Sequence, residues 1–304
     1  MEFNHVSVLF DETIESLNIK ENGLYVDCTC GGAGHSKAVL EKIPQGHLIA
    51  IDRDPDAIKV ISERIGSDKR VEIVHNTFDN IKEILNGRKA DGILADLGVS
   101  SFQLDNAERG FSFHNDAFLD MRMSKSGKSA YDVVNGYSEE HIANILFKFG
   151  EEKFARNIAK NIIKKRSVSP IKTTLELAEI VKDSYPAKFR RDGHPARKTF
   201  QAIRIEVNDE LTMLSGAVED MFDSLKTGGR LSIITFHSLE DRIVKEKFKE
   251  FTQGCTCPKE FPVCVCGKTP EGRIVNKGIT AGDKELNENN RSRSARLRTI
   301  EKIG

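Results

Sequence analysis

Residues 24–36 read Leu-Tyr-Val-Asp-Cys-Thr-Cys-Gly-Gly-Ala-Gly-His-Ser, a short apolar run that passes into a glycine cluster and then into a helical stretch. Residues 47–52 form a second apolar run, which ends in Asp52, and Asp54-Pro55 then supplies a helix N-cap followed by proline at the first helical position. Residues 71–75 and 91–95 repeat the pattern. Four strands separated by helical segments predict a parallel, doubly wound sheet.

After residue 110 the pattern becomes helical, with no strand predicted between Ser138 and Leu225. Thr173 and Glu176 form a capping box, and a long apolar periodicity from Phe200 to Leu225 predicts one helix that ends at Gly228-Gly229. Residues 230–236 read as a fifth strand, and residues 285–294 are polar enough for a loop. We therefore expect an α/β fold with an inserted all-helical domain. Its expected parts are residues 1–110 and 216–304 for the sheet and 111–215 for the insertion.

The composition is that of a globular protein. The 304 residues carry a formal net charge of zero, with 38% hydrophobic and 30% charged residues. No apolar run approaches the roughly 20 residues that a membrane span needs, and the first residues show no secretory signal. We expect a reducing cytoplasm, where the six cysteines are thiols or metal ligands before they are disulfides.

The zero net charge conceals an uneven distribution. Between Lys148 and Arg204 there are 15 lysines and arginines against 6 aspartates and glutamates, a local charge of +9. This asymmetry favours a polyanionic partner for the helical insertion, and ordinary solvated helix faces are the alternative.

The residues just after each predicted strand identify the ligand, because open α/β sheets bind ligands beyond the carboxyl ends of their strands. Asp52 follows the second strand, where a carboxylate can accept hydrogen bonds from ribose hydroxyls, and Phe78 after the third offers a ring to adenine. The cluster Gly32-Ala33-Gly34-His35-Ser36-Lys37 has lysine where a dinucleotide fingerprint needs its third glycine, and it is not a P-loop. A nucleoside ligand without pyrophosphate remains, and S-adenosylmethionine is the obvious one.

Long motifs continue through the chain, among them Asp96-Leu97-Gly98-Val99-Ser100-Ser101 and Phe236-His237-Ser238-Leu239-Glu240-Asp241-Arg242. In these motifs the chain resembles a family of bacterial methyltransferases that modify the exocyclic N4 amine of a cytidine in 16S ribosomal RNA. The resemblance covers nearly the whole chain. The stretches that carry it are residues 5–9, 32–36, 51–55, 91–101, 108–113, 119–123, 199–204, 229–234, 236–242 and 293–298.

The resemblance implies a Rossmann-like class I methyltransferase sheet and a helical insertion that holds RNA of the small ribosomal subunit. Carried across residue by residue, it places the S-adenosylmethionine contacts on Ala33, Gly34, His35, Asp52, Phe78, Asp96 and Gln103. Two departures stand out. Ala33 occupies a position where family members often have glycine. The acid-Pro-Pro-aromatic motif of the wider class of amino-group methyltransferases is absent after the fourth strand.

Methylation of a cytosine amine requires a hydrogen-bond acceptor, because the N4 lone pair is delocalised into the ring. Asp96 is the first candidate for this carboxylate. Ser100 and Phe102 in the following loop could supply a hydroxyl and a stacking face, or serve only to build the loop. His237 is a candidate general base whose alternative is a role at the helix start, where Ser238 and Asp241 resemble a capping box.

Basic side chains near aromatic rings are candidates for RNA contact. Arg109 and Arg122 flank the segment Phe111-Ser112-Phe113, with solvent-facing arginines over a phenylalanine core as the alternative. The basic faces of the insertion add further candidates, namely Lys164, Lys165, Arg166, Arg190 and Arg191.

Two Cys-x-Cys arms, Cys255 with Cys257 and Cys264 with Cys266, provide the four thiolates of a structural zinc site. A disulfide pair is the alternative. Cys28 and Cys30 lie in the predicted cofactor turn and read as small buried residues.

Two other functions compete with cytosine-N4 methylation. A noncatalytic ribosome-assembly factor could sense S-adenosylmethionine with the same nucleoside pocket and basic insertion. An RNA methyltransferase could instead act on another base, such as adenine at N6.

Overall fold

The computed structural model describes residues 7–186, 189, 194–255, 257–258, 261–263 and 265–304. The chain divides into two compact units. The first, here called the sheet unit, consists of residues 1–98 and 211–304, and the second, here called the helical unit, consists of residues 99–210. Among the described residues, no helix combines the length and apolar character that crossing a bilayer requires.

The sheet unit is built on a seven-stranded sheet in the described part of the chain, with the order β3-β2-β1-β4-β5-β7-β6. Neighbouring strands from β3 to β5 run parallel, as predicted. The last two strands pair antiparallel, β7 with β5 and β6 with β7. The strands are β1 (Leu24–Asp27), β2 (His47–Asp52), β3 (Val71–His75), β4 (Ala90–Asp96), β5 (Leu225–Thr235), β6 (Gly272–Ile279) and β7 (Arg296–Lys302).

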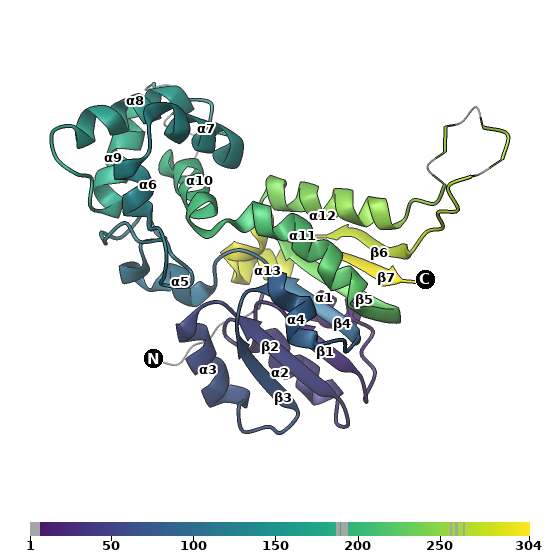
Figure 1. Cartoon of the computed structure of the whole chain (residues 1–304). Coiled ribbons are helices and arrows are strands. Elements are labelled where there is room, and N and C mark those ends of the chain that lie inside the picture. Colours follow the sequence, from purple (N-terminus) through teal and green to yellow (C-terminus); the bar gives the residue numbers. More distant parts are fainter. Residues whose placement is uncertain (1–6, 187–188, 190–193, 256, 259–260, 264) are drawn as a thin grey trace. The chain divides into compact units, whose positions relative to one another are not determined.

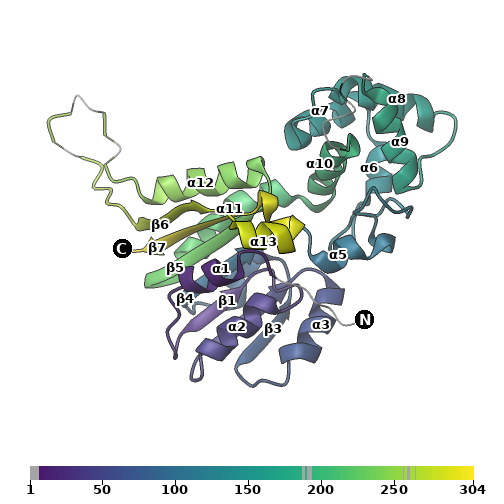
Figure 2. The same ribbon diagram turned by 180° about the vertical axis from the view of Figure 1, so that it is seen from behind.

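Helices cover both faces of this sheet (Figure 1). On the face that Figure 2 brings forward, α1 (Phe10–Ser16), α2 (Gly34–Lys42) and α3 (Pro55–Ile65) share an apolar core with β1 and β2. On the other face, α4 (Ile81–Leu85), α11 (Glu210–Asp223) and α12 (Ser238–Phe251) pack against the central strands. Because both faces are covered, β4 is buried along its length except at its last residue.

The C-terminal part of the sheet unit differs from the prediction. Strands β6 and β7 were not predicted. The segment expected as a loop between Glu285 and Ser294 instead contains part of α13 (Asp283–Glu288) and a 3-10 turn over Asn290–Ser294. These short elements lie between β6 and β7 in the chain, so they form the connection between the two antiparallel strands.

The helix expected from Phe200 to Leu225 is in fact two helices, α10 (Ala196–Asn208) and α11. Asp209 between them adopts a left-handed backbone with φ of 50°, which ends α10. The expected stop at Gly228-Gly229 is also wrong, because the chain has already entered β5 at Leu225.

The helical unit has its own apolar core, to which its helices contribute. The segment 99–110, which the sequence placed with the sheet, belongs to this unit, and Val99 and Leu104 pack against that core. The predicted capping box of Thr173 and Glu176 is confirmed. Besides α10, the helices are α5 (Ser101–Asp105), α6 (Ala130–Gly136), α7 (Glu139–Gly150), α8 (Ala155–Arg166) and α9 (Thr174–Ser184).

Candidate functional site

Three parallel strands end in aspartate at the same edge of the sheet. Asp27 is the last residue of β1, Asp52 of β2 and Asp96 of β4. These strands are neighbours, with β1 between the other two, so their carboxyl ends bring the three side chains to one edge. Asp52 and Asp96 were predicted from the sequence, whereas Asp27 was not proposed as a site residue.

The glycine turn after β1 is held by Asp52. Its Oδ2 accepts a hydrogen bond from the Gly31 amide at 2.8 Å, and its Oδ1 accepts one from the Asp54 amide at 2.8 Å. Gly31 (φ 46°) and Ala33 (φ 64°) both adopt left-handed backbones. This conformation favours glycine, so the alanine at position 33 is accommodated at some cost in backbone strain. A Cβ at Gly34 would lie 2.1 Å from the Ser7 Oγ, so a larger residue there would require the Ser7 side chain to move.

Asp27 is almost completely buried beneath this turn. Its Oδ2 accepts a hydrogen bond from the Ser36 hydroxyl at 2.6 Å, and its Oδ1 accepts one from the Thr29 amide at 3.2 Å. Burial raises the pKa of Asp27 to about 6, against the lowering effect of these hydrogen bonds. Burial likewise raises the pKa of Asp52 to about 6.

Asp96 lies at the end of β4, with 26% of its side chain exposed. Its Oδ1 atom is buried and has no hydrogen-bond donor within the described part of the chain. Burial, followed by the charges of Asp27 and Glu240, raises the pKa of Asp96. A buried acceptor without a donor is costly, so this oxygen is suited to a donor from a bound molecule.

Two predicted cofactor contacts flank these carboxylates. The His35 ring is buried at the start of α2, stacks on Phe10 and places its Nδ1 4.0 Å from the Asp96 Oδ2. Phe78 begins a 3-10 turn shortly after the end of β3 and packs, half buried, against the apolar core on one face of the sheet. Both residues therefore belong to the edge at which the strands end.

His237 is the N-cap residue of α12, and its partner in the capping box is Glu240. The box expected from Ser238 and Asp241 is therefore wrong by one position, because extended backbone at His237 makes it the cap. The His237 Nδ1 accepts a hydrogen bond from the Glu240 amide at 3.3 Å, and its Nε2 lies 3.1 Å from the Glu240 Oε1. A neutral ring that accepts at Nδ1 carries its proton on Nε2. This arrangement favours a capping role for His237 over general base catalysis.

Ser100 and Gln103 lie in the helical unit, where they cap α5 reciprocally. The Ser100 Oγ accepts a hydrogen bond from the Gln103 amide at 3.2 Å, and the Gln103 Oε1 accepts one from the Ser100 amide at 3.0 Å. Phe102, also in α5, is half buried. The Ser100 and Gln103 side chains thus have a local capping role, which agrees with the loop-building alternative for Ser100 and was not predicted for Gln103.

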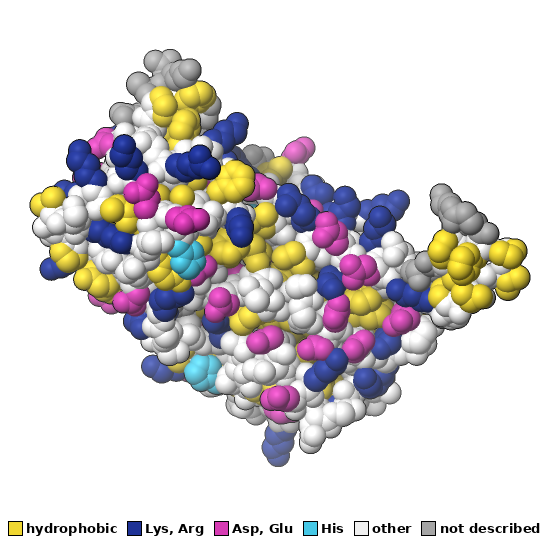
Figure 3. Space-filling view, turned by 45° about the horizontal axis from the view of Figure 1, so that its top comes forward, with side chains coloured by type: hydrophobic (Ala, Val, Ile, Leu, Met, Phe, Trp, Pro, Cys, Tyr) yellow, Lys and Arg dark blue, Asp and Glu magenta, His cyan; other side chains and the backbone are white. Residues whose placement is uncertain are grey.

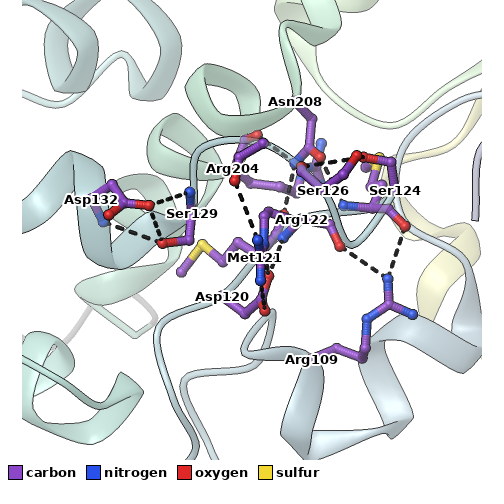
Figure 4. A network of polar contacts seen from close by, with 12 residues as sticks. Arg109, Asp120, Met121, Arg122, Ser124, Ser126, Ser129, Asp132, Arg204 and Asn208 are labelled. Carbon is purple, nitrogen blue, oxygen red and sulfur yellow. Dashed lines mark hydrogen bonds and ion pairs between the residues drawn. The ribbon is translucent and has the colours of Figure 1, made fainter.

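Arg109 and Arg122 belong to a network that shapes a loop of the helical unit (Figure 4). The buried Arg109 guanidinium donates to the carbonyl oxygens of Arg122 and Met123, at 3.0 and 2.9 Å. Arg122 forms a two-point ion pair with Asp120, and Asn208 accepts a hydrogen bond from the Met123 amide. The Arg109 Nη2 thus holds the loop backbone, and phosphate contact by Arg109 stays a prediction.

The other predicted RNA-binding residues divide into three groups. Lys164 and Lys165 are exposed at the end of α8. Arg166 is half buried and donates to the carbonyl oxygens of Val134 and Tyr137, so it stabilises the C-terminal end of α6. Arg190 and Arg191 lie outside the described residues.

A ring stack in the helical unit was only partly predicted. Phe113, named from the sequence, stacks on His194 with ring centroids 4.5 Å apart and contacts His114 at the same distance. Phe113 also packs on the buried Phe200, which anchors the stack to the core. Both histidines are exposed, so flat rings are presented at the surface of this basic unit.

Three of the four cysteines of the predicted metal site lie together in the loop between α12 and β6. The ligand atoms of Cys255, Cys257 and Cys266 are all within 4.8 Å of one another. Cys264 lies outside the described residues. Cys28 and Cys30 are buried, as predicted for the cofactor turn.

The sheet unit thus carries an acidic group of side chains, Asp27, Asp52, Asp96 and Glu240, at one edge. Burial raises the pKa values of Asp27, Asp52 and Asp96. These carboxylates favour a ligand that carries positive charge, because a nearby cation stabilises their ionised forms. Glu240 was not among the predicted site residues. Its position three residues after a histidine cap was the signal that could have revealed it.

Comparison with known proteins extends over the whole chain. Residues 2–303 match the family described as the MraW methylase family. The protein named ribosomal RNA small subunit methyltransferase H from Clostridium botulinum strain Kyoto / Type A2 is 58% identical over 309 residues, which cover 100% of both chains. The protein of the same name from strain 657 / Type Ba4 is similar to the same extent, with 58% identity and 100% coverage of both chains.

Proposed function

The chain belongs to the MraW methylase family, and we infer from this that it transfers a methyl group from S-adenosylmethionine to the N4 amine of a cytidine in 16S ribosomal RNA. The mechanism is supported by the acidic edge, the name used here for the group of Asp27, Asp52, Asp96 and Glu240 in the sheet unit. In this group the buried Asp96 Oδ1 has no hydrogen-bond donor among the described residues. Family membership also favours catalysis over a sensing role, since the named relatives are methyltransferases.

The acidic edge fits S-adenosylmethionine in charge and in hydrogen bonding. Asp52 would hold the ribose, as its carboxylate is already oriented by two backbone amides. Asp96 would lie toward the methionine end, where the ligand is cationic. When bound, S-adenosylmethionine supplies a methyl group that its positively charged sulfur already activates, so the protein needs no covalent nucleophile.

We assign to Asp96 the acceptor role that the reaction requires. A hydrogen bond from N4 to the Asp96 carboxylate localises the nitrogen lone pair, which forms the new bond to the methyl carbon. The bond between the methyl carbon and the sulfonium sulfur would break at the same time, and S-adenosylhomocysteine would leave with that electron pair. The attacking amine then carries a positive charge and must lose a proton. Asp96 is suited to take it, because burial and the neighbouring Asp27 and Glu240 charges raise its pKa.

We expect the affinity for S-adenosylmethionine to depend on pH, because the acidic edge contains carboxylates with raised pKa values. The pKa values of Asp27 and Asp52 are raised to about 6, so both carboxylates gain protons as the pH falls through this value. Protonation removes the negative charge that favours a sulfonium. We therefore expect S-adenosylmethionine to bind several-fold more weakly at pH 5 than at pH 8.

Calorimetric titrations between pH 5 and pH 8 measure this effect. S-adenosylhomocysteine is the matched control ligand, because it has the same nucleoside and amino acid but an uncharged sulfur. Its affinity should fall less than that of S-adenosylmethionine. Equal pH profiles for the two ligands would show that the carboxylates do not act on the sulfonium.

We propose that the helical unit binds the RNA through its basic faces and exposed rings. The local charge of +9 between Lys148 and Arg204 lies in this unit, and Lys164 and Lys165 are exposed on it. The stack of Phe113 with His114 and His194 offers faces on which unpaired bases can pack. Affinity should fall steeply with salt, because neutralised phosphates release counterions.

Replacing Lys164 and Lys165 together with glutamine should weaken binding of unmodified small ribosomal subunits roughly threefold to tenfold and lower the salt slope by about 1.5. Filter binding across a salt series measures both quantities. Glutamine at the exposed Lys59 and Lys69 of the sheet unit is the matched control. An unchanged slope in the Lys164 and Lys165 variant would mean that this charge is ordinary surface charge.

The decisive test of the reaction uses labelled S-adenosylmethionine and unmodified small ribosomal subunits, the proposed substrate in the cytoplasm. Digestion of the RNA and chromatography should identify N4-methylated cytidine as the labelled nucleoside. Label on adenine would assign the other target base, and no label despite cofactor binding would favour the sensing role.

A further inference from the structure

The loop that joins α12 to β6 contains a cluster of reactive side chains among its described residues. It is separate in sequence from the strand ends that form the acidic edge. We propose that Cys255, Cys257 and Cys266 bind one zinc ion in this loop, and that the ion fixes the loop's conformation.

The sulfur positions fit a tetrahedral thiolate site. The Sγ atoms of Cys255 and Cys266 are 3.8 Å apart, and all three sulfurs lie within 4.8 Å of one another. A Zn–S bond of about 2.3 Å places neighbouring sulfurs of a tetrahedron roughly 3.8 Å apart. A disulfide would instead require about 2.05 Å between two of the sulfurs. The separation of Cys255 and Cys266 therefore matches shared coordination.

The backbone also supports a thiolate at this place. The Val265 amide donates a hydrogen bond to the Cys257 Sγ at 3.3 Å. Such outer-shell donors orient metal-bound thiolates and stabilise their negative charge. Soft thiolate ligands select zinc over the hard cations magnesium and calcium.

The large hydrophobic side chains in the described part of the loop are mostly exposed and bury little apolar surface. Phe261, Val263 and Val265 are 51%, 70% and 73% exposed. Figure 3 shows hydrophobic side chains gathered on the surface of this projecting loop. A metal ion can provide the cross-link that a small core cannot, because binding free energy then becomes folding free energy.

The three sulfurs leave the fourth position of the tetrahedron to another ligand. The sequence predicts Cys264 for that position, but this residue lies outside the described residues. The proposal therefore depends on the three described sulfurs, and Cys257 is the one whose loss separates zinc binding from a disulfide between Cys255 and Cys266.

The test measures metal in the full-length protein purified under reducing conditions without chelators. Elemental analysis should find about one zinc ion per chain. The Cys257→Ser variant should retain less than about a fifth of this zinc, whereas Val263→Ser in the same loop should retain it. Cobalt substitution should produce the intense visible absorption of a tetrahedral thiolate site in the parent and Val263→Ser proteins only.

A second readout reports the structural role of the ion. Chelation should accelerate proteolytic cleavage within the loop while the thermal unfolding of the sheet unit changes little. The absence of zinc and cobalt binding in the reduced parent protein would overturn the proposal. Full zinc retention in Cys257→Ser, or a Cys255–Cys266 disulfide found by mass spectrometry in the freshly isolated protein, would do the same.

Discussion

Asp96→Asn should slow methyl transfer by about 100-fold or more, equivalent to about 2.7 kcal/mol of activation free energy. Asparagine keeps the shape of the side chain at the end of β4 but loses its charge and its capacity to take a proton. The lost interaction strengthens as the N4 amine becomes positive, so the chemical step should suffer more than RNA binding.

The measurement is single-turnover methylation at saturating S-adenosylmethionine and RNA, because Asp96 also faces the proposed methionine end of the cofactor. Asp91→Asn is the matched control, since it removes a buried carboxylate from the other end of the same strand. The control should transfer the methyl group at a rate within about twofold of the parent per folded molecule. A rate within twofold for Asp96→Asn, under about 0.5 kcal/mol, would remove Asp96 from the mechanism and direct attention to Ser100, Phe102 or His237.

Asp52→Ala should weaken S-adenosylmethionine binding by roughly 1 to 3 kcal/mol, about fivefold to 150-fold in the dissociation constant. Two losses contribute to this effect. The ribose hydroxyls lose their acceptor, and the amides of Gly31 and Asp54 lose the carboxylate that orients the turn. Asp52→Asn, which keeps one oxygen acceptor, should therefore fall between the parent and the alanine variant.

Isothermal titration calorimetry provides the dissociation constants for these variants. The control is Asp68→Ala, because Asp68 precedes β3 and pairs with Arg70 at the opposite, amino end of the strands. Its removal should leave cofactor affinity unchanged. If Asp52→Ala binds as tightly as the parent, Asp52 has no part in holding the cofactor.

The site residues that could be predicted are those whose position follows from chain topology. In a parallel sheet every strand end of one polarity reaches the same edge, so Asp52 and Asp96 could be placed together from the sequence. Asp27 also ends a parallel strand, β1, and therefore reaches the same edge. It was interpreted as part of the glycine turn because that turn follows it directly in the sequence. Glu240 could have been recognised as the capping-box partner of His237, but its burial could not be predicted, since burial depends on how α12 packs against the sheet.

The arginine side chains show why the roles of other candidate residues could not be predicted from the sequence. A basic residue beside phenylalanines suits both RNA contact and loop construction, and only the loop conformation shows that the Arg109 guanidinium faces two carbonyl oxygens. The strands at the antiparallel edge were missed for a related reason. Strand β6 is largely exposed, so its sequence lacks the continuous apolar run by which β4 could be recognised.

The insertion of the helical unit between β4 and β5 has a consequence for synthesis on the ribosome. The sheet pairs Ile93 with Leu231, yet residues 99–210 are made between them. During translation, the edge of β4 that later pairs with β5 therefore stays unpaired while the entire helical unit emerges. Helical contacts are local and form quickly, whereas this distant strand pairing must wait for the C-terminal part of the chain. Completion of the sheet is thus expected to be the late step of folding, and the nascent chain is most exposed to aggregation before it.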